Sequence, residues 1–331
     1  MRNNTRLAMA LLPLLLVLTA ALSLATGSYE IGWGEILQAL TGQETARSEV
    51  ILNLRLPRVL LSLFTGANLT LGGIYMQALL RNPLADPYIM GLTAGAGLGV
   101  NLVILGIIPL TAFTLLTYPT FASLGAIASL LLVLGLGFRS LSRQDERLII
   151  AGVAVSSICT ALTGLLIYLF AQDDQVRQVV FWSFGNFNKA DTGAALVSGL
   201  LLLISLAGGW LLGPRLDVLA LGDFEAQSLG MPVQRIKLLL LLLTSVCVGG
   251  NVAFSGPVGF VGMMIPHVSR ALFSEKHRIQ ILPAALLGGT FLCACDLLSR
   301  WISPPAGIPI GIVTALLGVP FFMFLLWRER R

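Results

Sequence analysis

The sequence has few charged residues. Asp, Glu, Lys and Arg make up only 11% of its 331 residues, whereas a soluble domain carries about 25%. So little charge leaves too little polar surface to face water on every side. Hydrophobic residues make up 56% of the chain and occur in long runs, such as 7–26 and 196–212. A run of about 20 apolar residues matches the roughly 30 Å hydrocarbon core of a bilayer. The sequence therefore predicts an integral membrane protein.

Residues that carry chemistry are also scarce. The two histidines, His267 and His277, provide no nucleophile–base pair and no second metal ligand. The four cysteines all lie in apolar segments without zinc-site spacing, where a thiol behaves as a small hydrophobe. No Gly-x-x-x-x-Gly-Lys-Ser/Thr phosphate loop occurs, so this chain cannot hydrolyse a nucleotide by that chemistry. We therefore expect no catalytic residue, no metal site and no cofactor bound by this chain.

Polar punctuation divides the chain into about ten membrane spans. The first apolar run follows Arg2 and Arg6, as in a secretory signal, but it is longer than a signal core and many more spans follow. We therefore expect it to remain as an uncleaved helix. The predicted spans are 7–26, 58–80, 88–108, 112–137, 148–170, 193–213, 236–254, 258–273, 281–302 and 308–327. The eighth is the weakest, because it is short and interrupted by Gly259, Gly262 and Pro266.

The distribution of basic residues predicts the orientation. With the N-terminus inside, fifteen Lys and Arg residues lie on the cytoplasmic side and six on the outer side, together the 21 in the chain. The positive-inside rule then places both termini in the cytoplasm. The net charge of +5 follows from this topology. No segment has the basic, aromatic-interleaved character of a nucleic-acid surface.

The helix expected over 58–80 carries small residues and two amides, Asn68 and Gln77, inside the membrane. Small residues allow helices to approach closely, and buried amides bond across helices. This face serves either as contact between helices or as the lining of a pathway. The segment 81–87 that follows holds two prolines, Pro83 and Pro87, which indicate a tight cytoplasmic turn.

The cytoplasmic stretch 214–230 is unusually apolar for a loop that crosses water. Asp223 can cap a short helix, Glu225 suits its first turn and Gly230 its end. An exposed apolar patch marks either a membrane surface or a docking partner, and we favour a partner. The residues we expect to make this contact are Leu219, Leu221, Phe224, Glu225, Ala226, Leu229 and Gly230.

Three of the six outer basic residues gather at the outer ends of the second and ninth spans: Arg55, Arg58 and Arg300. Positive charge there opposes the positive-inside bias, so a specific use as a docking surface is plausible. The alternative is structural. Asp296 and Arg300 are four residues apart, the order that favours a pair within one helix, while Arg55 and Arg58 could reach the headgroups.

Several strings occur together in a fixed order. They are LRLPR at 54–58, RNPLADP at 81–87, AQSLG at 226–230, GPVGFVG at 256–262 with IPH at 265–267, DLLSR at 296–300, and IPIG at 308–311 with GVPFF at 318–322. As a set, they resemble the iron-chelate and cobalamin permease family of ABC importers, also called FecCD or BtuC-like. The resemblance covers the chain from about residue 50 to its end.

The resemblance implies an all-α, BtuC-like (type II ABC importer) permease fold with ten spans, forming one transmembrane domain over 1–331 in the bacterial inner membrane. It implies a second permease subunit, identical or different, a cytoplasmic ABC ATPase dimer that binds ATP and Mg²⁺, and a periplasmic substrate-binding protein. The stretch 214–230 would be the coupling helices that contact the ATPases. Asn82 and Leu84 would lie at the cytoplasmic gate, and Arg55, Arg58 and Arg300 would meet the binding protein.

The cargo is less defined. A ferric siderophore is the first choice from the resemblance, with haem, cobalamin and molybdate also open. One position departs from the family pattern, since Gly307 stands where a glutamate usually precedes the IPIG string. The alternative function is an ion-coupled secondary transporter. Such proteins place ionisable residues in mid-span, and Asp296 is the nearest candidate here.

Overall fold

The computed structural model describes residues 3–27, 29, 31–43, 47–108, 114–137, 144–304 and 307–329, and every regular element among them is helical. Ten of these helices match the ten predicted spans in order; residues 112–113, the expected start of the fourth span, lie outside the described residues. The ten are α1 (Asn3–Ala25), α4 (Leu56–Leu80), α5 (Leu92–Ile104), α6 (Thr114–Gly137), α7 (Gln144–Phe170), α9 (Thr192–Leu219), α11 (Val233–Ser255), α12 (Val261–Leu272), α13 (His277–Ile302) and α14 (Ile310–Glu329).

The lengths of these helices confirm the prediction of an all-α polytopic membrane protein. Within the described ranges, seven helical stretches are long and apolar enough to cross a bilayer, and α5 and α14 contribute shorter apolar helices. The short α12 has 12 residues and contains Pro266. The sequence had indicated the same weakness in the eighth span.

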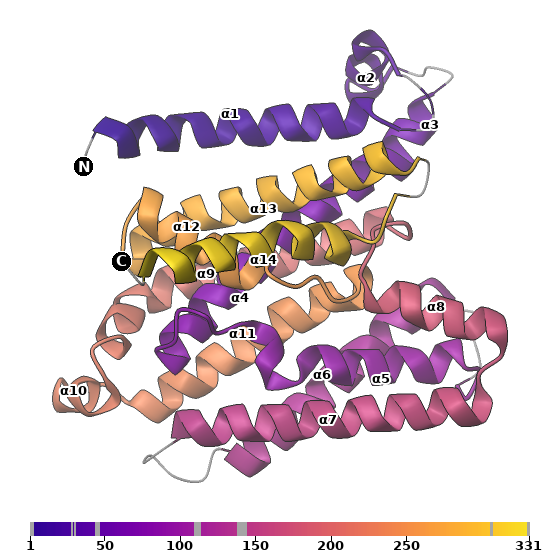
Figure 1. The fold of residues 1–331 in the computed structure, drawn as a ribbon. Helices are drawn as coiled ribbons and strands as arrows, with labels where there is room; N and C mark the ends of the chain where they lie inside the picture. The colour runs from indigo at the N-terminus through magenta and orange to yellow at the C-terminus, as the bar shows by residue number, and fades with distance from the viewer. Residues whose placement is uncertain are drawn as a thin grey trace.

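Short elements lie at the two ends of the bundle (Figure 1). One end, which we call the α2 end, carries α2 (Trp33–Leu40), α3 (Ser48–Val50), the π-helix η1 (Ile51–Arg55) and α8 (Asp173–Ser183). The opposite end, which we call the α10 end, carries the 3-10 helix η2 (Pro87–Met90) and α10 (Asp223–Ser228). Helix α1 begins and α14 finishes at the α10 end (Figure 1).

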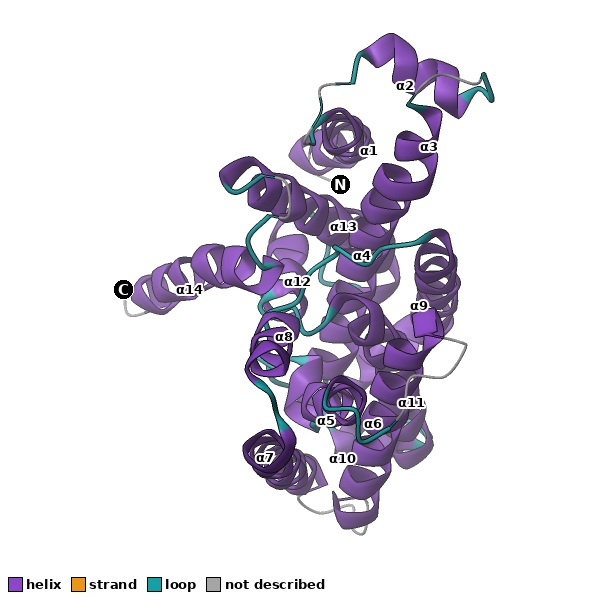
Figure 2. Ribbon diagram, turned by 90° about the vertical axis from the view of Figure 1, so that its right-hand side faces the viewer, coloured by secondary structure: helices purple, strands orange, loops and turns teal. Residues whose placement is uncertain are grey.

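Helix α4 is the centre of the bundle and packs against α9, α11, α12 and α13 (Figure 2). Nearly every residue from Leu61 to Leu80 is buried. Glycines permit these close contacts: a Cβ at Gly73 would overlap the carbonyl of Gly262, and one at Gly66 would overlap that of Gly288. Small residues at helix contacts are the usual means of association in a membrane, because backbones can then approach closely.

Buried polar side chains join α4 to α9 and α11. The Asn251 Oδ1 accepts hydrogen bonds from the hydroxyls of Thr65, at 3.1 Å, and Ser198. The Asn68 Nδ2 donates to the Ser198 carbonyl at 3.1 Å. Asn68 is therefore a contact between helices and not part of a pathway, which decides the question left open for this part of the helix.

The outer faces of the bundle are apolar. Large hydrophobic side chains such as Leu131, Ile150, Tyr168, Leu196 and Leu316 are exposed on α6, α7, α9 and α14. Soluble monomers rarely expose such continuous apolar area. These faces therefore suit contact with membrane lipid.

Candidate functional site at the α10 end

The turn after α4 presents the two residues predicted to form a gate. Arg81 closes α4 in the left-handed conformation, with φ of 47°. The Asn82 Oδ1 accepts a hydrogen bond from the Leu84 backbone N–H at 2.9 Å, which fixes the turn. Both side chains are exposed, and that of Leu84 is 48% exposed. The two residues thus lie together on the surface of the α10 end.

Asp86 anchors the far side of this turn. Its Oδ1 caps η2 by accepting a hydrogen bond from the Tyr88 backbone N–H at 2.9 Å. Burial raises the pKa of the Asp86 carboxyl from its usual 3.8 to about 6, and the hydrogen bond from Tyr88 opposes that rise. The turn is therefore followed by a buried carboxyl group with a raised pKa.

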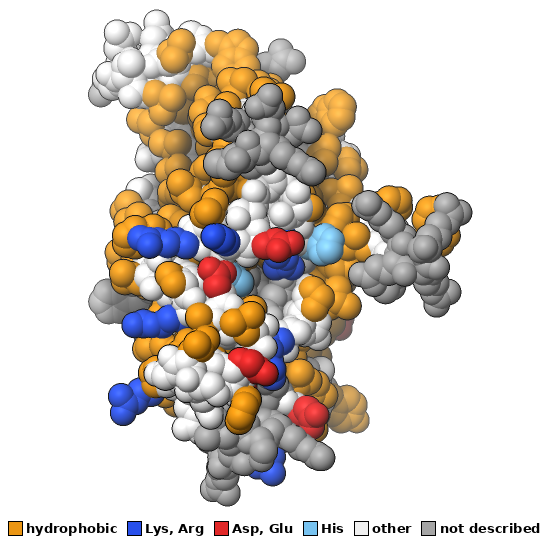
Figure 3. Space-filling view, turned by 90° about the vertical axis from the view of Figure 1, so that its left-hand side faces the viewer, with side chains coloured by type: hydrophobic (Ala, Val, Ile, Leu, Met, Phe, Trp, Pro, Cys, Tyr) orange, Lys and Arg blue, Asp and Glu red, His pale blue; other side chains and the backbone are white. Residues whose placement is uncertain are grey.

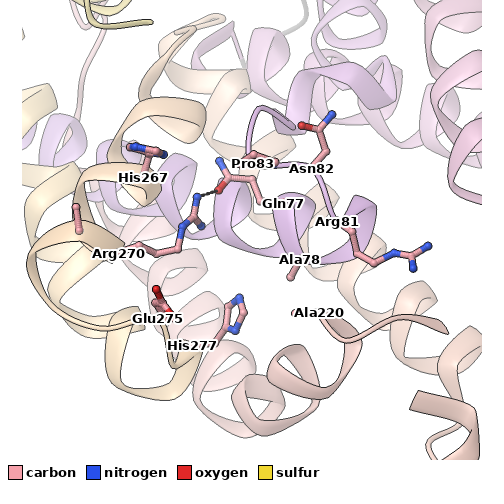
Figure 4. Close-up of a pocket in the computed structure, with 11 residues that line it drawn as sticks. Gln77, Ala78, Arg81, Asn82, Pro83, Ala220, His267, Arg270, Glu275 and His277 are labelled. Atoms are coloured by element: carbon pink, nitrogen blue, oxygen red, sulfur yellow. Dashed lines mark hydrogen bonds between the residues drawn. The ribbon is translucent and has the colours of Figure 1, made fainter. Parts of the chain in front are cut away.

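A cavity of about 530 Å³ opens beside the turn (Figure 4). Three parts of the chain line it: the end of α4 with its turn, the segment after α9, and the α12–α13 connection. The lining residues are Gln77, Ala78, Arg81, Asn82, Pro83, Ala220, His267, Arg270, Ala271, Glu275 and His277. Arg270 crosses from α12 and donates to the Gln77 Oε1 at 2.7 Å. The structure thus places the predicted gate turn beside the segment that leads to α10.

The stretch 214–230 differs in part from the sequence prediction. Helix α9 continues to Leu219, so the first part of the stretch is the end of a long helix, and α10 is the separate one. Asp223 is the first residue of α10 and not its cap. Gly222 holds the cap position with φ of 131°, a conformation that favours glycine.

The seven predicted contact residues divide into two groups. Leu219 and Ala226 are fully buried within this chain, where they pack the segment against the bundle. The side chains of Leu221, Phe224 and Leu229 are 65%, 78% and 68% exposed, and Glu225 and Gly230 are exposed as well. Figure 3 views the α10 end, where charged side chains and histidines gather with hydrophobic side chains among them. Leu221, Phe224 and Leu229 thus form an exposed apolar surface on and beside α10.

Sequence reasoning missed one residue of this end. Lys237 in α11 is fully buried, and its Nζ lies 2.7 Å from the Oδ2 of Asp223. In the sequence Lys237 counted only as one more cytoplasmic charge. The available signal was its position between Ile236 and the apolar run that begins at Leu238.

At the α2 end, two of the three arginines predicted to meet the binding protein, Arg55 and Arg300, are buried. Arg55 is buried and donates to the carbonyls of Leu24, Ala25 and Tyr29, at the C-terminal end of α1 and just beyond it. Arg300 is also buried and donates to the Thr26 carbonyl at 2.8 Å. Their guanidinium groups thus bond the end of α1, and docking of a binding protein on these two arginines stays a prediction.

Arg58 and Asp296 form an ion pair in the same region. The Arg58 Nη2 lies 2.8 Å from the Asp296 Oδ1, and the Arg300 Nε lies 3.1 Å from the Oδ2 of the same carboxylate. The predicted pair within one helix is thus present, and a second arginine joins it. The Arg58 Nη1 also donates to the Asn188 Oδ1 at 3.0 Å. The Arg58 side chain is 15% exposed.

Three further features noted in the sequence are Gly307, the residue types that bind metals, and the cysteines. Gly307 adopts φ of 80°, and a Cβ there would meet the Ser299 Oγ, so a glutamate would be strained at this position. Across the described ranges, no three side chains of His, Cys, Asp or Glu gather as a metal ion would require. The four cysteines, which we interpreted as packing residues, are all buried and free.

The chain is similar over nearly its whole length to known permeases. It is 38% identical to the hemin transport system permease HmuU of Yersinia pestis, covering 99% of this chain and 98% of that protein. It is also 38% identical to the vitamin B12 import permease BtuC of Klebsiella pneumoniae, covering 96% of this chain and 93% of that protein.

The fold agrees with this similarity. It superposes, with a TM-score of 0.86 and 33% identity, on an inward-facing structure assigned to the metal-chelate type of ABC transporter, covering 98% of this chain and 99% of the other. The FecCD transport family matches residues 15–328. With its ten helices in the expected order, this chain belongs to the FecCD transport family.

Proposed function

We propose that this protein is the membrane permease of an ABC importer that moves a metal chelate into the cell. The observation that carries the proposal is the arrangement of the α10 end. An exposed apolar surface of Leu221, Phe224 and Leu229 directly follows Ala220, which lines the same cavity as Asn82. A partner bound to the first can therefore act on the second over a short path.

The partners follow from the family and the surfaces. An ABC ATPase dimer, which binds the ATP and Mg²⁺, docks on α10, and a periplasmic binding protein delivers the cargo at the α2 end. A second permease subunit, identical or different, completes the pathway in the bacterial inner membrane. Among the three arginines, Arg58 is the one that keeps an exposed edge for the binding protein.

The cargo class is a bulky metal complex. Relatives are named for haem and for vitamin B12, two of the cargoes that the sequence left open beside a ferric siderophore. Ion coupling has little support, because the candidate carboxylate Asp296 is already paired with Arg58 and Arg300.

The mechanism is alternating access driven by the partner. ATP binding draws the ATPases together, and their movement reaches the permease through α10. Helices α9 and α11, which flank α10, pack on α4 and pass the movement to the turn at Asn82 and Leu84. Two discrete arrangements of these packed helices then open the pathway to one side at a time.

The test is disruption of the apolar surface. Leu221→Asp and Phe224→Asp should abolish ATPase co-purification and chelate uptake in proteoliposomes, because a carboxylate cannot be buried without a partner. The control is Leu272→Asp, which changes an exposed leucine of the same end outside the segment 214–230 and should keep both. Survival of transport and co-purification in the Phe224 variant would make α10 a helix that merely lies on the membrane surface.

A further inference from the structure

A buried ion pair fastens α10 to the helix that follows it. The Lys237 side chain is 0% exposed and that of Asp223 is 20% exposed, and their charged atoms lie 2.7 Å apart. Lysine is almost never fully buried unless it is paired, because its charge loses water. Two residues earlier on the same helix, Arg235 is exposed. A basic residue near the start of α11 can therefore face water, and the burial of Lys237 is a specific feature.

The pair acts at the first residue of α10. This helix has six residues, and a helix that short is not stable without tertiary contacts. Asp223 directly precedes Phe224 and lies two residues after Leu221, the two exposed groups of the proposed docking surface. Farther along, Ala226 is buried and its carbonyl accepts a hydrogen bond from the Met231 N–H. The Asp223–Lys237 pair therefore sets the position of the docking side chains relative to α11.

From Lys237 the connection continues into the centre of the bundle. Helix α11 packs along α4, and Asn251 near its far end bonds Thr65 of α4 at 3.1 Å. Helix α4 in turn ends at the turn that holds Asn82. A displacement of α10 is thus transferred through one buried ion pair and two packed helices to the proposed gate.

A contact between Asp217 and His277 holds the other side of the same segment. The His277 Nδ1 lies 2.7 Å from the Asp217 Oδ1, joining the last turns of α9 to the first residue of α13. The segment between Asp217 and Lys237 is therefore attached at both ends. The exposed apolar surface lies between the two attachments. A partner that moves this surface therefore also moves α9, α11 and α13, to which the segment is attached.

From this geometry we propose that Asp223 and Lys237 are positioning residues that transmit the movement of α10 to α11, so that ATP hydrolysis by the partner is coupled to transport. The proposal rests on the proposed function, since it needs an ATPase on α10. A pair with only a structural role would change the amount of folded protein. A coupling pair changes the number of chelate molecules transported per ATP hydrolysed in protein that is folded and assembled.

The decisive variant is the double change Asp223→Asn with Lys237→Met. Removing one partner leaves a buried charge without its counter-charge, whereas removing both is often neutral for stability. We therefore expect the double variant to fold and to co-purify with the ATPase. In proteoliposomes that contain the complex and the binding protein, with a ferric siderophore, haem and vitamin B12 as the probes, it should hydrolyse ATP but transport at least tenfold less per ATP of each probe that the wild type takes up.

Further variants separate coupling from folding. Lys237→Arg keeps the charge and should retain most of the coupling ratio, and the matched control Arg235→Met removes an exposed charge from the same helix and should keep all of it. A double variant that assembles and transports with the wild-type ratio would overturn the proposal. Failure of the wild-type permease to bind any ATPase would instead refute the proposed function, so the two failures are distinguishable.

Discussion

Arg58 and Asp296 lie 238 positions apart in the chain, yet the Arg58 guanidinium donates to both oxygens of the Asp296 carboxylate. The carboxylate is fully buried and also bonds Arg300, which in turn holds the end of α1. One acidic side chain thus joins α4 to α13 and, through Arg300, to α1. Positive charge at the α2 ends of these helices has a structural use that the count of basic residues could not reveal.

The first prediction concerns this cluster. Asp296→Asn leaves Arg58 and Arg300 without their shared counter-charge, and breaking a buried pair from one side costs about 3–5 kcal/mol. We expect a clear fall in the thermal unfolding temperature of the purified permease in detergent. The control Glu49→Gln changes an exposed acid at the same end and should leave that temperature within a degree or so. Equal unfolding temperatures for Asp296→Asn and wild type would contradict the structural role.

The second prediction concerns topology. Single cysteines at Gln43 and Gln172 should react with an impermeant thiol reagent in intact cells, because both positions lie at the α2 end, which we assign to the periplasm. Cysteines at Gln144 and Gln227 should react only after lysis. The four native cysteines are buried and should give little background. Labelling of Gln144→Cys from outside would reverse the orientation.

The third prediction concerns the gate. Leu84→Cys presents an exposed thiol on the turn that Asn82 fixes, and Asn82→Cys presents one in place of the Asn82 side-chain hydrogen bond. In a complex with two copies of the permease, we expect cross-linking between subunits in some nucleotide states and not in others. Gln43→Cys, at the opposite end of the bundle, serves as the control and should not follow the nucleotide. Absence of cross-links in every state would remove these residues from the gate.

The fourth prediction concerns pH and Asp86. Burial raises the pKa of this carboxyl to about 6 in the folded protein, above its usual 3.8. The folded state therefore binds the proton more tightly than the unfolded state, so the stability from this group is complete below about pH 4 and is lost as pH rises through 6. Asp86→Asn should flatten this part of the pH profile and raise the unfolding temperature at pH 8 by a few degrees.

The Asp86→Asn variant changes the charge at this position and keeps the hydrogen bond. Asparagine keeps the side-chain oxygen that accepts from the Tyr88 N–H, so the cap of η2 is retained. Thermal unfolding from pH 4 to pH 8 would compare the two proteins. An unchanged slope between pH 4 and pH 6 would show that Asp86 is not the group that titrates.

The class of fold could be predicted from the sequence because the bilayer imposes a simple rule. A span needs about 20 apolar residues with all backbone groups bonded within the helix. The runs of apolar residues between polar breaks therefore predicted ten helices in the correct order. The same rule gives little information on a helix as short as α12, whose 12 residues include Arg270 and Pro266.

The candidate site was only partly predictable. Exposure of Leu221, Phe224 and Leu229 agrees with the apolar content of a loop between two spans. The same content could not show that Leu219 and Ala226 point inward, because α9 runs longer than the apolar stretch and α10 is only six residues long. Which residues of a helix point outward and which point inward depends on the residue at which the helix begins. Composition does not show where that first residue is.

Composition and pattern by themselves determined that this is a helical membrane protein, how its helices follow one another, and where its polar turns lie. Only the tertiary structure decided which charges are free. Arg55, Arg58 and Arg300 look alike in the sequence, but Arg55 and Arg300 bond the end of α1, whereas Arg58 and Arg300 share Asp296. Lys237 became notable only through Asp223, 14 residues away. The physical reason is that a charge acts on whatever lies within a few ångströms in space, and in a bundle those neighbours come from distant parts of the chain.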